Sequence, residues 1–250
     1  MVTAFANDES QEARGHGARY SIRPLTTDDA RVSARLHQEV LGEEFLARGG
    51  VGFLGLYHLA WCESPTGLAL AAVDVGGEII GVLLGALQPA AHYRFMARRR
   101  GIAMAARLLG HAATHPLFAR ELLATRAARY ARGAVRLVSR RPGTARGPGH
   151  GPKEAEITHL MVAPGARRAG VARALVQEAL RAAQAAELDQ VVLVTPPELA
   201  ASGFYLRLGW QPYGEVTSRS GEHFVRYKWP LARRVVAQGR DGGPTSCPAS

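Results

Sequence analysis

The sequence predicts an α/β (α+β) fold, in which strands and helices share one chain of 250 residues. Short apolar runs rich in β-formers alternate with longer runs whose apolar residues recur at helical spacing. The dipeptide Gly76-Gly77 separates two strand-like runs, which is a strong signal for a hairpin. The stretch "ITHLMVAPGARRAGVARALV", from Ile157 to Val176, begins as a strand and ends as an alanine-rich helix.

Composition limits the classes of protein to be considered. The net charge of +10, carried mainly by arginine, favours anionic partners such as a phosphorylated cofactor, nucleic acid or a lipid surface. Cys62 and Cys247 lie far apart and offer neither a disulfide framework nor zinc-ligand spacing. The first residues lack the apolar core of a signal peptide, and no apolar run reaches membrane-spanning length. We therefore expect a cytoplasmic protein.

The first part of the chain is predicted to contain an arm, a strand and a helix. Residues 1–18 are polar and small, which favours a disordered N-terminal arm. The alternating run 19–25 is the first expected strand. Thr26 precedes Asp29 as in a capping box, so a helix is expected from there to about Leu41.

A second helix and a hairpin are expected next. The run 50–63 is strongly apolar and predicts a helix, and the two strands that flank the glycine pair are expected at 68–75 and 78–88. An arginine-rich segment at 92–141 follows, and its apolar residues recur at roughly helical spacing. A proline near its middle predicts two helices, and the Pro/Gly-rich run 142–153 is interpreted as a flexible linker.

The last part of the chain returns to alternating strands and helices. Gly209 suits a left-handed cap at the end of a short helix. Residues 232–250 are predicted to be a C-terminal tail, so that residues 19–231 form a single domain. We expect a strand at 154–163, a helix at 169–186, a strand at 189–195 and a short helix at 197–208. A final hairpin is expected to pair 210–218 with 222–231.

The turn between the strand and the helix of Ile157–Val176 is a candidate anion site. The first turn of a helix leaves backbone N–H groups unpaired and is partly positive. Gly170 lets a ligand approach the backbone, and Arg167 and Arg168 add positive charge. The turn lacks the Gly-Lys-Ser/Thr of a Walker P-loop and the three glycines of a dinucleotide-binding loop. An ordinary joint with solvated arginines is the alternative.

Two motifs resemble a known family. Arg167-x-x-Gly170-x-Ala172 resembles the Q/R-x-x-G-x-G/A signature of the GNAT superfamily of acyl-CoA-dependent N-acetyltransferases. "ASGFYLRLGW" resembles the A-x-x-[FL]-Y-x-x-x-G-[FW] segment that follows the fifth strand in that family. The resemblance covers residues 19–91 and 154–230. It implies a mixed, mostly antiparallel central sheet flanked by helices, with the arginine-rich segment as a helical insertion between the third and fourth strands.

The resemblance also implies how acetyl-CoA, the acyl donor, would bind. The pantetheine arm would pair with the strand, and a strand N–H would polarise the acyl carbonyl. Many family members have asparagine where this chain has Glu198, which puts one contact to the cofactor arm in doubt. The residues expected to contact the arm are Leu160, Met161 and Val162, and those expected to contact the pyrophosphate are Arg167, Arg168, Ala169, Gly170, Val171 and Ala172.

Three residues are candidates for the acyl-transfer chemistry. Glu156 stands where several family members carry their glutamate base, but a bulge must turn it toward the cleft because it shares strand parity with Leu160. His159 is the second candidate base. Tyr205 occupies the position that often protonates the leaving thiolate in the family. The alternatives are a solvent-facing glutamate, a packed histidine and a core tyrosine. No metal is expected, because the histidines show no ligand spacing.

The leading hypothesis is transfer of an acetyl group from acetyl-CoA to the primary amine of a small molecule, by direct attack with general-base assistance. Aminosugar, antibiotic amine, polyamine, amino acid and protein N-terminus all fit as acceptors, and an acyl-carrier protein fits as a donor. From another class, the chain could bind acyl-CoA without catalysis, or bind an anionic surface through its basic insertion. No motif for specific nucleic-acid binding is present.

Overall fold

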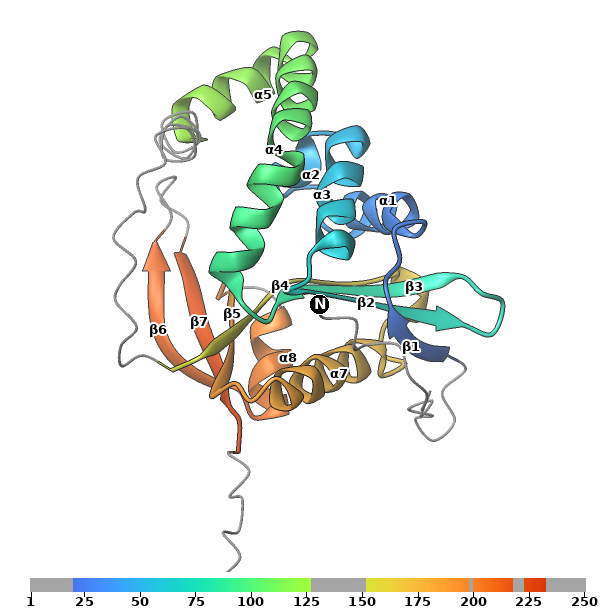
Figure 1. Ribbon diagram of the computed structural model, residues 1–250, viewed down its shortest axis with the longest axis vertical. Helices are drawn as coiled ribbons and strands as arrows, with labels where there is room; N and C mark the ends of the chain where they lie inside the picture. Colours follow the sequence, from blue (N-terminus) through green and yellow to red (C-terminus); the bar gives the residue numbers. More distant parts are fainter. Residues whose placement is uncertain (1–19, 127–151, 198–199, 218–222, 233–250) are drawn as a thin grey trace, which may run out of the picture.

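A computed structural model describes residues 20–126, 152–197, 200–217 and 223–232. These residues form one seven-stranded sheet with helices on both of its faces (Figure 1). The strands are β1 (Tyr20–Pro24), β2 (Gly67–Asp74), β3 (Ile79–Ala86), β4 (Glu154–Val162), β5 (Gln190–Thr195), β6 (Gln211–Thr217) and β7 (His223–Pro230). The helices are α1 (Ala30–Val40), α2 (Phe45–Arg48), α3 (Val51–Glu63), α4 (Pro89–Thr114), α5 (Pro116–Glu121), α7 (Val171–Ala185) and α8 (Ala200–Leu208).

The sheet is mixed and mostly antiparallel, as the resemblance implied. Its strand order is β1-β2-β3-β4-β5-β7-β6, and only β4 and β5 run parallel. Gly77, at φ +84°, closes the predicted hairpin between β2 and β3, and Gly209, at φ +96°, caps α8 as predicted. The short helix α2 has no periodic signal in the sequence and was not expected. The predicted helix at 169–186 begins only at Val171, because the preceding residues form a turn.

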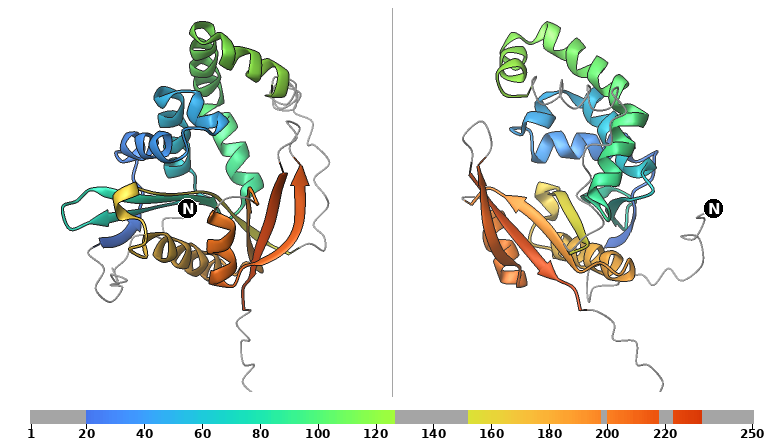
Figure 2. Two further views of the ribbon diagram at one scale, coloured as in Figure 1. Left: turned by 180° about the vertical axis from the view of Figure 1, so that it is seen from behind. Right: turned by 60° about the vertical axis from the view of Figure 1, so that its left-hand side comes forward.

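Helices cover the two faces of the sheet unequally. α7 and α8 pack against one face, whereas α1, α3 and α4 cover the other face over the first strands (Figures 1 and 2). Leu175, Tyr205 and Trp210 belong to the core on the α7 face, and Trp61 and Met161 belong to the core on the α3 face. Burial of such large side chains stabilises the fold by about 2 kcal/mol each.

The arginine-rich insertion begins as α4 and α5 between β3 and β4. It packs on the domain through apolar residues, including Met96, Leu108 and Phe118. Most of its described arginines face solvent, but Arg100 forms an ion pair with Glu63. The predicted break near His115-Pro116 is confirmed, since α4 ends at Thr114 and α5 begins at Pro116.

Several predicted segments lie outside the described residues. They are the N-terminal arm, residues 127–141 of the insertion, nearly all of the linker at 142–153 and nearly all of the C-terminal tail. The domain boundaries at 19 and 231 therefore stay predictions. Among the helices that the structure describes, none has the length and apolar character needed to cross a membrane.

Candidate active site

The parallel strands β4 and β5 separate halfway along β4. They pair from Glu154, opposite Gln190, to Ile157, opposite Leu193. Beyond Ile157 the edge of β4 toward β5 has no strand partner among the described residues, while its other edge pairs with β3 as far as Val162. The backbone groups of this free edge can therefore bind an extended ligand as an added strand.

A bulge in β4 decides which side chains face the site. Leu84 pairs with His159 and Gly85 pairs with Ile157, so Thr158 is the extra residue. Glycine is needed at position 85, because a Cβ there would lie 2.6 Å from the carbonyl oxygen of Glu156. The extra residue reverses the strand parity, and Glu156 therefore lies on the same face of the sheet as His159.

Glu156 has the surroundings of a general base. Its side chain is half-buried, and the phenol of Tyr93 on α4 donates a hydrogen bond to its Oε2 across 3.4 Å. Burial raises the pKa of Glu156, and this effect outweighs the opposing effects of Tyr93, His159 and Arg226. A carboxylate with a raised pKa is a better proton acceptor near neutral pH.

His159 lies on the same face but deeper. It is 7% exposed, and its ring lies 4.7 Å from that of His37 and 5.7 Å from that of Tyr57. Its Nε2 is 3.6 Å from Oε2 of Glu44. The structure thus brings both candidate bases together but leaves only Glu156 half-accessible.

Tyr205 lies on the other face of the sheet from Glu156 and His159. It is 5% exposed and packs in the α7-side core beside Phe204, Trp210 and Tyr227. Burial raises the pKa of Tyr205 well above its usual value, so the phenol keeps its proton at neutral pH. The structure does not place this side chain next to the two candidate bases.

The basic glycine turn ends in the N-terminus of α7. Arg168 and Gly170 have φ values of +63° and +84°, and Gly170 is the N-cap of this 15-residue helix. Residues 167–170 are exposed, whereas Val171 is buried and anchors the helix in the core. A Cβ at Gly170 would have only the Tyr20 hydroxyl oxygen nearby, at 3.4 Å, so the backbone N–H groups are open to an anion. The turn therefore fits a phosphate group. Glu198 lies outside the described residues.

Tyr93 and Arg226 act on Glu156 but were not predicted from the sequence. Tyr93 stands in the arginine-rich insertion, and Arg226 stands on β7 opposite Val194. No motif marks either residue, because each reaches Glu156 only through the packing of distant elements.

Basic side chains border the face that carries Glu156. Residues opposite each other in neighbouring strands share a face, so the pairings of Val192 with Glu156 and Lys228, and of Val194 with Arg226, place both cations there. Val194 is 44% exposed, which shows that this face is open beside β5.

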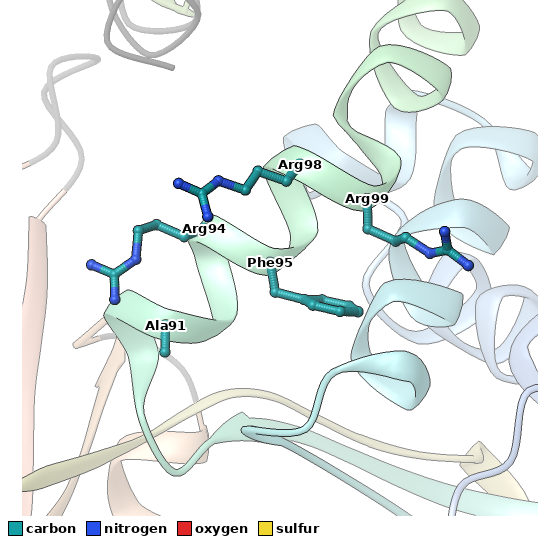
Figure 3. Close-up of a pocket in the computed structure, with 5 residues that line it drawn as sticks. All are labelled: Ala91, Arg94, Phe95, Arg98 and Arg99. Atoms are coloured by element: carbon teal, nitrogen blue, oxygen red, sulfur yellow. The ribbon is translucent and has the colours of Figure 1, made fainter. Parts of the chain in front are cut away.

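On α4, a shallow pocket is lined by Ala91, Arg94, Phe95, Arg98 and Arg99 (Figure 3).

A mixed sheet whose parallel pair separates beside a glycine turn at a helix N-terminus is the arrangement that the resemblance to acyl-CoA-dependent acyltransferases implied. The model of the acetyltransferase (GNAT) family matches residues 34–210, which is more than half of the chain. The chain belongs to the GNAT acetyltransferase family. No curated protein matches the sequence.

Solved structures share the fold at low sequence identity. Naa20 from Chaetomium thermophilum in complex with a bisubstrate analogue is 22% identical, with a TM-score of 0.50 and coverage of 89% of this chain and 93% of that chain. A chimera of the spermidine N-acetyltransferase SpeG from Vibrio cholerae and hSSAT is 14% identical, with a TM-score of 0.53 and coverage of 85% and 96%. These similarities extend the family assignment to the three-dimensional fold.

Proposed function

We propose that the protein transfers the acetyl group of acetyl-CoA to the primary amine of a small molecule by direct attack, with Glu156 as general base. The observation that carries this proposal is the bulge at Thr158. It turns the half-buried carboxylate of Glu156 onto the open face of the sheet, next to the point where β4 and β5 separate. A base at this point can take a proton from an amine that approaches the free edge of β4.

The donor would lie along β4 and over the turn before α7. Acetyl-CoA supplies a thioester whose acyl carbon the amine attacks. Backbone N–H groups around Gly170 and the charges of Arg167 and Arg168 would bind its pyrophosphate. The free edge at Leu160–Val162 would hold the extended arm, and a backbone N–H there would stabilise charge on the acyl oxygen. Tyr205, from the opposite face, would protonate the leaving sulfur.

Accessibility favours Glu156 over His159 as the base. An ammonium group has no lone pair, so the acceptor must lose a proton to a group that it can touch. Glu156 is half-buried and has a raised pKa, whereas His159 is 7% exposed and packed against two rings. His159 is packed too deeply to contact the amine.

The charge around Glu156 favours an acceptor that also carries an anionic group. Arg226 and Lys228 share its face of the sheet, and Arg94 and Arg98 extend from α4 toward the side on which β6 and β7 lie (Figures 1 and 3). These cations attract a carboxylate or phosphate and repel a polycation. The spermidine N-acetyltransferase chimera shares only the fold at 14% identity, so its acceptor is not carried over.

Replacement of the base tests the proposal. Glu156→Gln keeps the shape but cannot accept a proton, so kcat/KM with acetyl-CoA should fall roughly 100-fold or more at neutral pH. The matched control is Glu154→Gln on the same strand, which should stay within a few-fold of wild type. The acceptor class is assayed with pairs of amines that differ by one carboxylate, and the anionic member should have the lower KM. If Glu156→Gln keeps the wild-type pH profile while His159→Gln loses its acidic limb, the base is His159.

A further inference from the structure

A chain of buried histidines runs behind the candidate active site. The Ser33 hydroxyl lies 2.6 Å from Nδ1 of His58, and Nε2 of His58 lies 2.9 Å from Nδ1 of His37. All three side chains are fully buried. The proposed acyl transfer does not use this row of histidines. One nitrogen at its end has no hydrogen-bond partner among the described residues.

That atom is Nε2 of His37. It has no hydrogen-bond partner among the described residues, although it is buried. When His58 donates from Nδ1 to Ser33 and His37 donates from Nδ1 to His58, Nε2 of His37 carries a lone pair. This lone pair faces the carboxylate of Glu44, whose Oε2 lies 3.8 Å away. In this arrangement of protons a bound cation satisfies both groups, whereas in the alternative arrangement Nε2 of His37 carries a proton itself.

A second imidazole faces the same carboxylate. Nε2 of His159 lies 3.6 Å from Oε2 of Glu44. One ligand atom from each of His37, Glu44 and His159 falls within 4.8 Å of the other two. The three residues come from α1, from the loop before α2 and from β4, so the ligand set is assembled only by the fold.

We propose that His37, Glu44 and His159 bind a divalent transition-metal ion of the Zn²⁺ class. Two imidazole nitrogens and one carboxylate oxygen are a known ligand set for Zn²⁺, with water in the remaining position. Metal-to-ligand distances of about 2.0–2.2 Å require the three groups to contract slightly around the ion. Glu44 can make this adjustment, because its side chain is 47% exposed and lies in a loop, and it also provides the route of entry.

The histidine chain gives this site its orientation. A metal-bound imidazole usually donates its other N–H to a fixed acceptor, which holds the ring in place. His58 provides that acceptor for His37, and Ser33 in turn fixes His58. Nδ1 of His159 has no such partner among the described residues, so His37 is the better-oriented of the two ligands. Glu156 is not a ligand, so the proposed base stays outside the metal site, although the ligand His159 lies on the same face of the sheet.

Titration of the chelator-treated, tag-free chain with Zn²⁺ tests the site. Calorimetry should show one tight equivalent, and Co²⁺ should give the visible absorption of a low-coordinate nitrogen–oxygen site. Glu44→Gln and His37→Gln should each weaken Zn²⁺ binding by at least about 10-fold, and His58→Gln should weaken it by about 10-fold through loss of orientation. Glu44 is half-exposed, so Glu44→Gln keeps the test valid even if the buried histidine variants do not fold.

The matched control is another pair of histidines. The rings of His111 and His115 stack 3.8 Å apart at the end of α4, and neither residue belongs to the cluster of His37, Glu44 and His159. His111→Gln should leave the tight Zn²⁺ equivalent intact, and Zn²⁺ should raise the melting temperature of this variant but not that of Glu44→Gln. The proposal is overturned if no tight equivalent is found, if Glu44→Gln binds Zn²⁺ as wild type does, or if His111→Gln loses the tight equivalent.

Discussion

The phenol of Tyr93 donates a hydrogen bond to the carboxylate of Glu156, with 3.4 Å between the two oxygens. Tyr93 belongs to α4 and Glu156 belongs to β4, so the arginine-rich insertion contacts the candidate base directly. Burial, together with the neighbouring Glu156, raises the pKa of Tyr93 to about 12. The phenol therefore stays protonated and acts as a donor throughout the neutral range. The insertion therefore contributes a side chain to the candidate site.

Opposite pH shifts are expected when the two neighbours of Glu156 are changed. The hydrogen bond from Tyr93 lowers the pKa of Glu156, and the charge of Glu154 raises it. Tyr93→Phe should therefore move the acidic limb of the kcat/KM profile upward, and the shift should be small because a 3.4 Å hydrogen bond is long. Glu154→Gln should move the limb downward. Below the limb Glu156 is protonated and cannot act as base. If the acidic limb stays in place in both variants, or moves in the same direction in both, Glu156 is not the general base.

The turn before α7 should lose acetyl-CoA when a side chain is placed at Gly170. At φ +84° an L-residue is strained by about 1–2 kcal/mol, and its side chain would occupy the position proposed for phosphate. Acetyl-CoA should raise the melting temperature of wild type but not of Gly170→Val, each compared with its own ligand-free form. Gly165→Val is the control, because a Cβ at Gly165 meets nothing within 4 Å. If acetyl-CoA raises the melting temperatures of Gly170→Val and Gly165→Val equally, the pyrophosphate does not bind at Gly170.

Comparison of two buried tyrosines in the same core distinguishes a chemical role of Tyr205 from a packing role. Tyr205 and Tyr227 have ring centroids 6.2 Å apart, and both are almost fully buried. If Tyr205 protonates the leaving sulfur, Tyr205→Phe should lower kcat at least about 10-fold with little change in acetyl-CoA affinity. The raised pKa makes this phenol a weak acid, which limits the loss. Tyr227→Phe removes the same atom nearby and should leave kcat unchanged. Equal losses would assign both tyrosines to packing alone.

Local patterns in the sequence determined most of the elements and one part of the site. Thr26 and Asp29 predicted a helix start at this point, and although α1 itself begins at Ala30, the Thr26 N–H and hydroxyl both donate to the Asp29 carboxylate, at 2.8 and 2.7 Å. Gly77, Gly170 and Gly209 all have the positive φ that their turns require. Such signals are readable because a turn or a cap depends on a few consecutive residues.

The tertiary structure alone decided which side chains meet. Tyr93 and Glu156 are separated by 63 positions, and His37 and His58 by 21, so no short pattern relates them. The bulge at Thr158 was needed for Glu156 to face the site, but its position depends on how β4 aligns with Gly85 of β3. A contact between distant residues follows from the path and packing of the whole chain, and local propensity carries no information about that path. The sequence therefore determined the family and the glycine turn before α7, whereas packing determined the neighbours of Glu156 and the cluster of His37, Glu44 and His159.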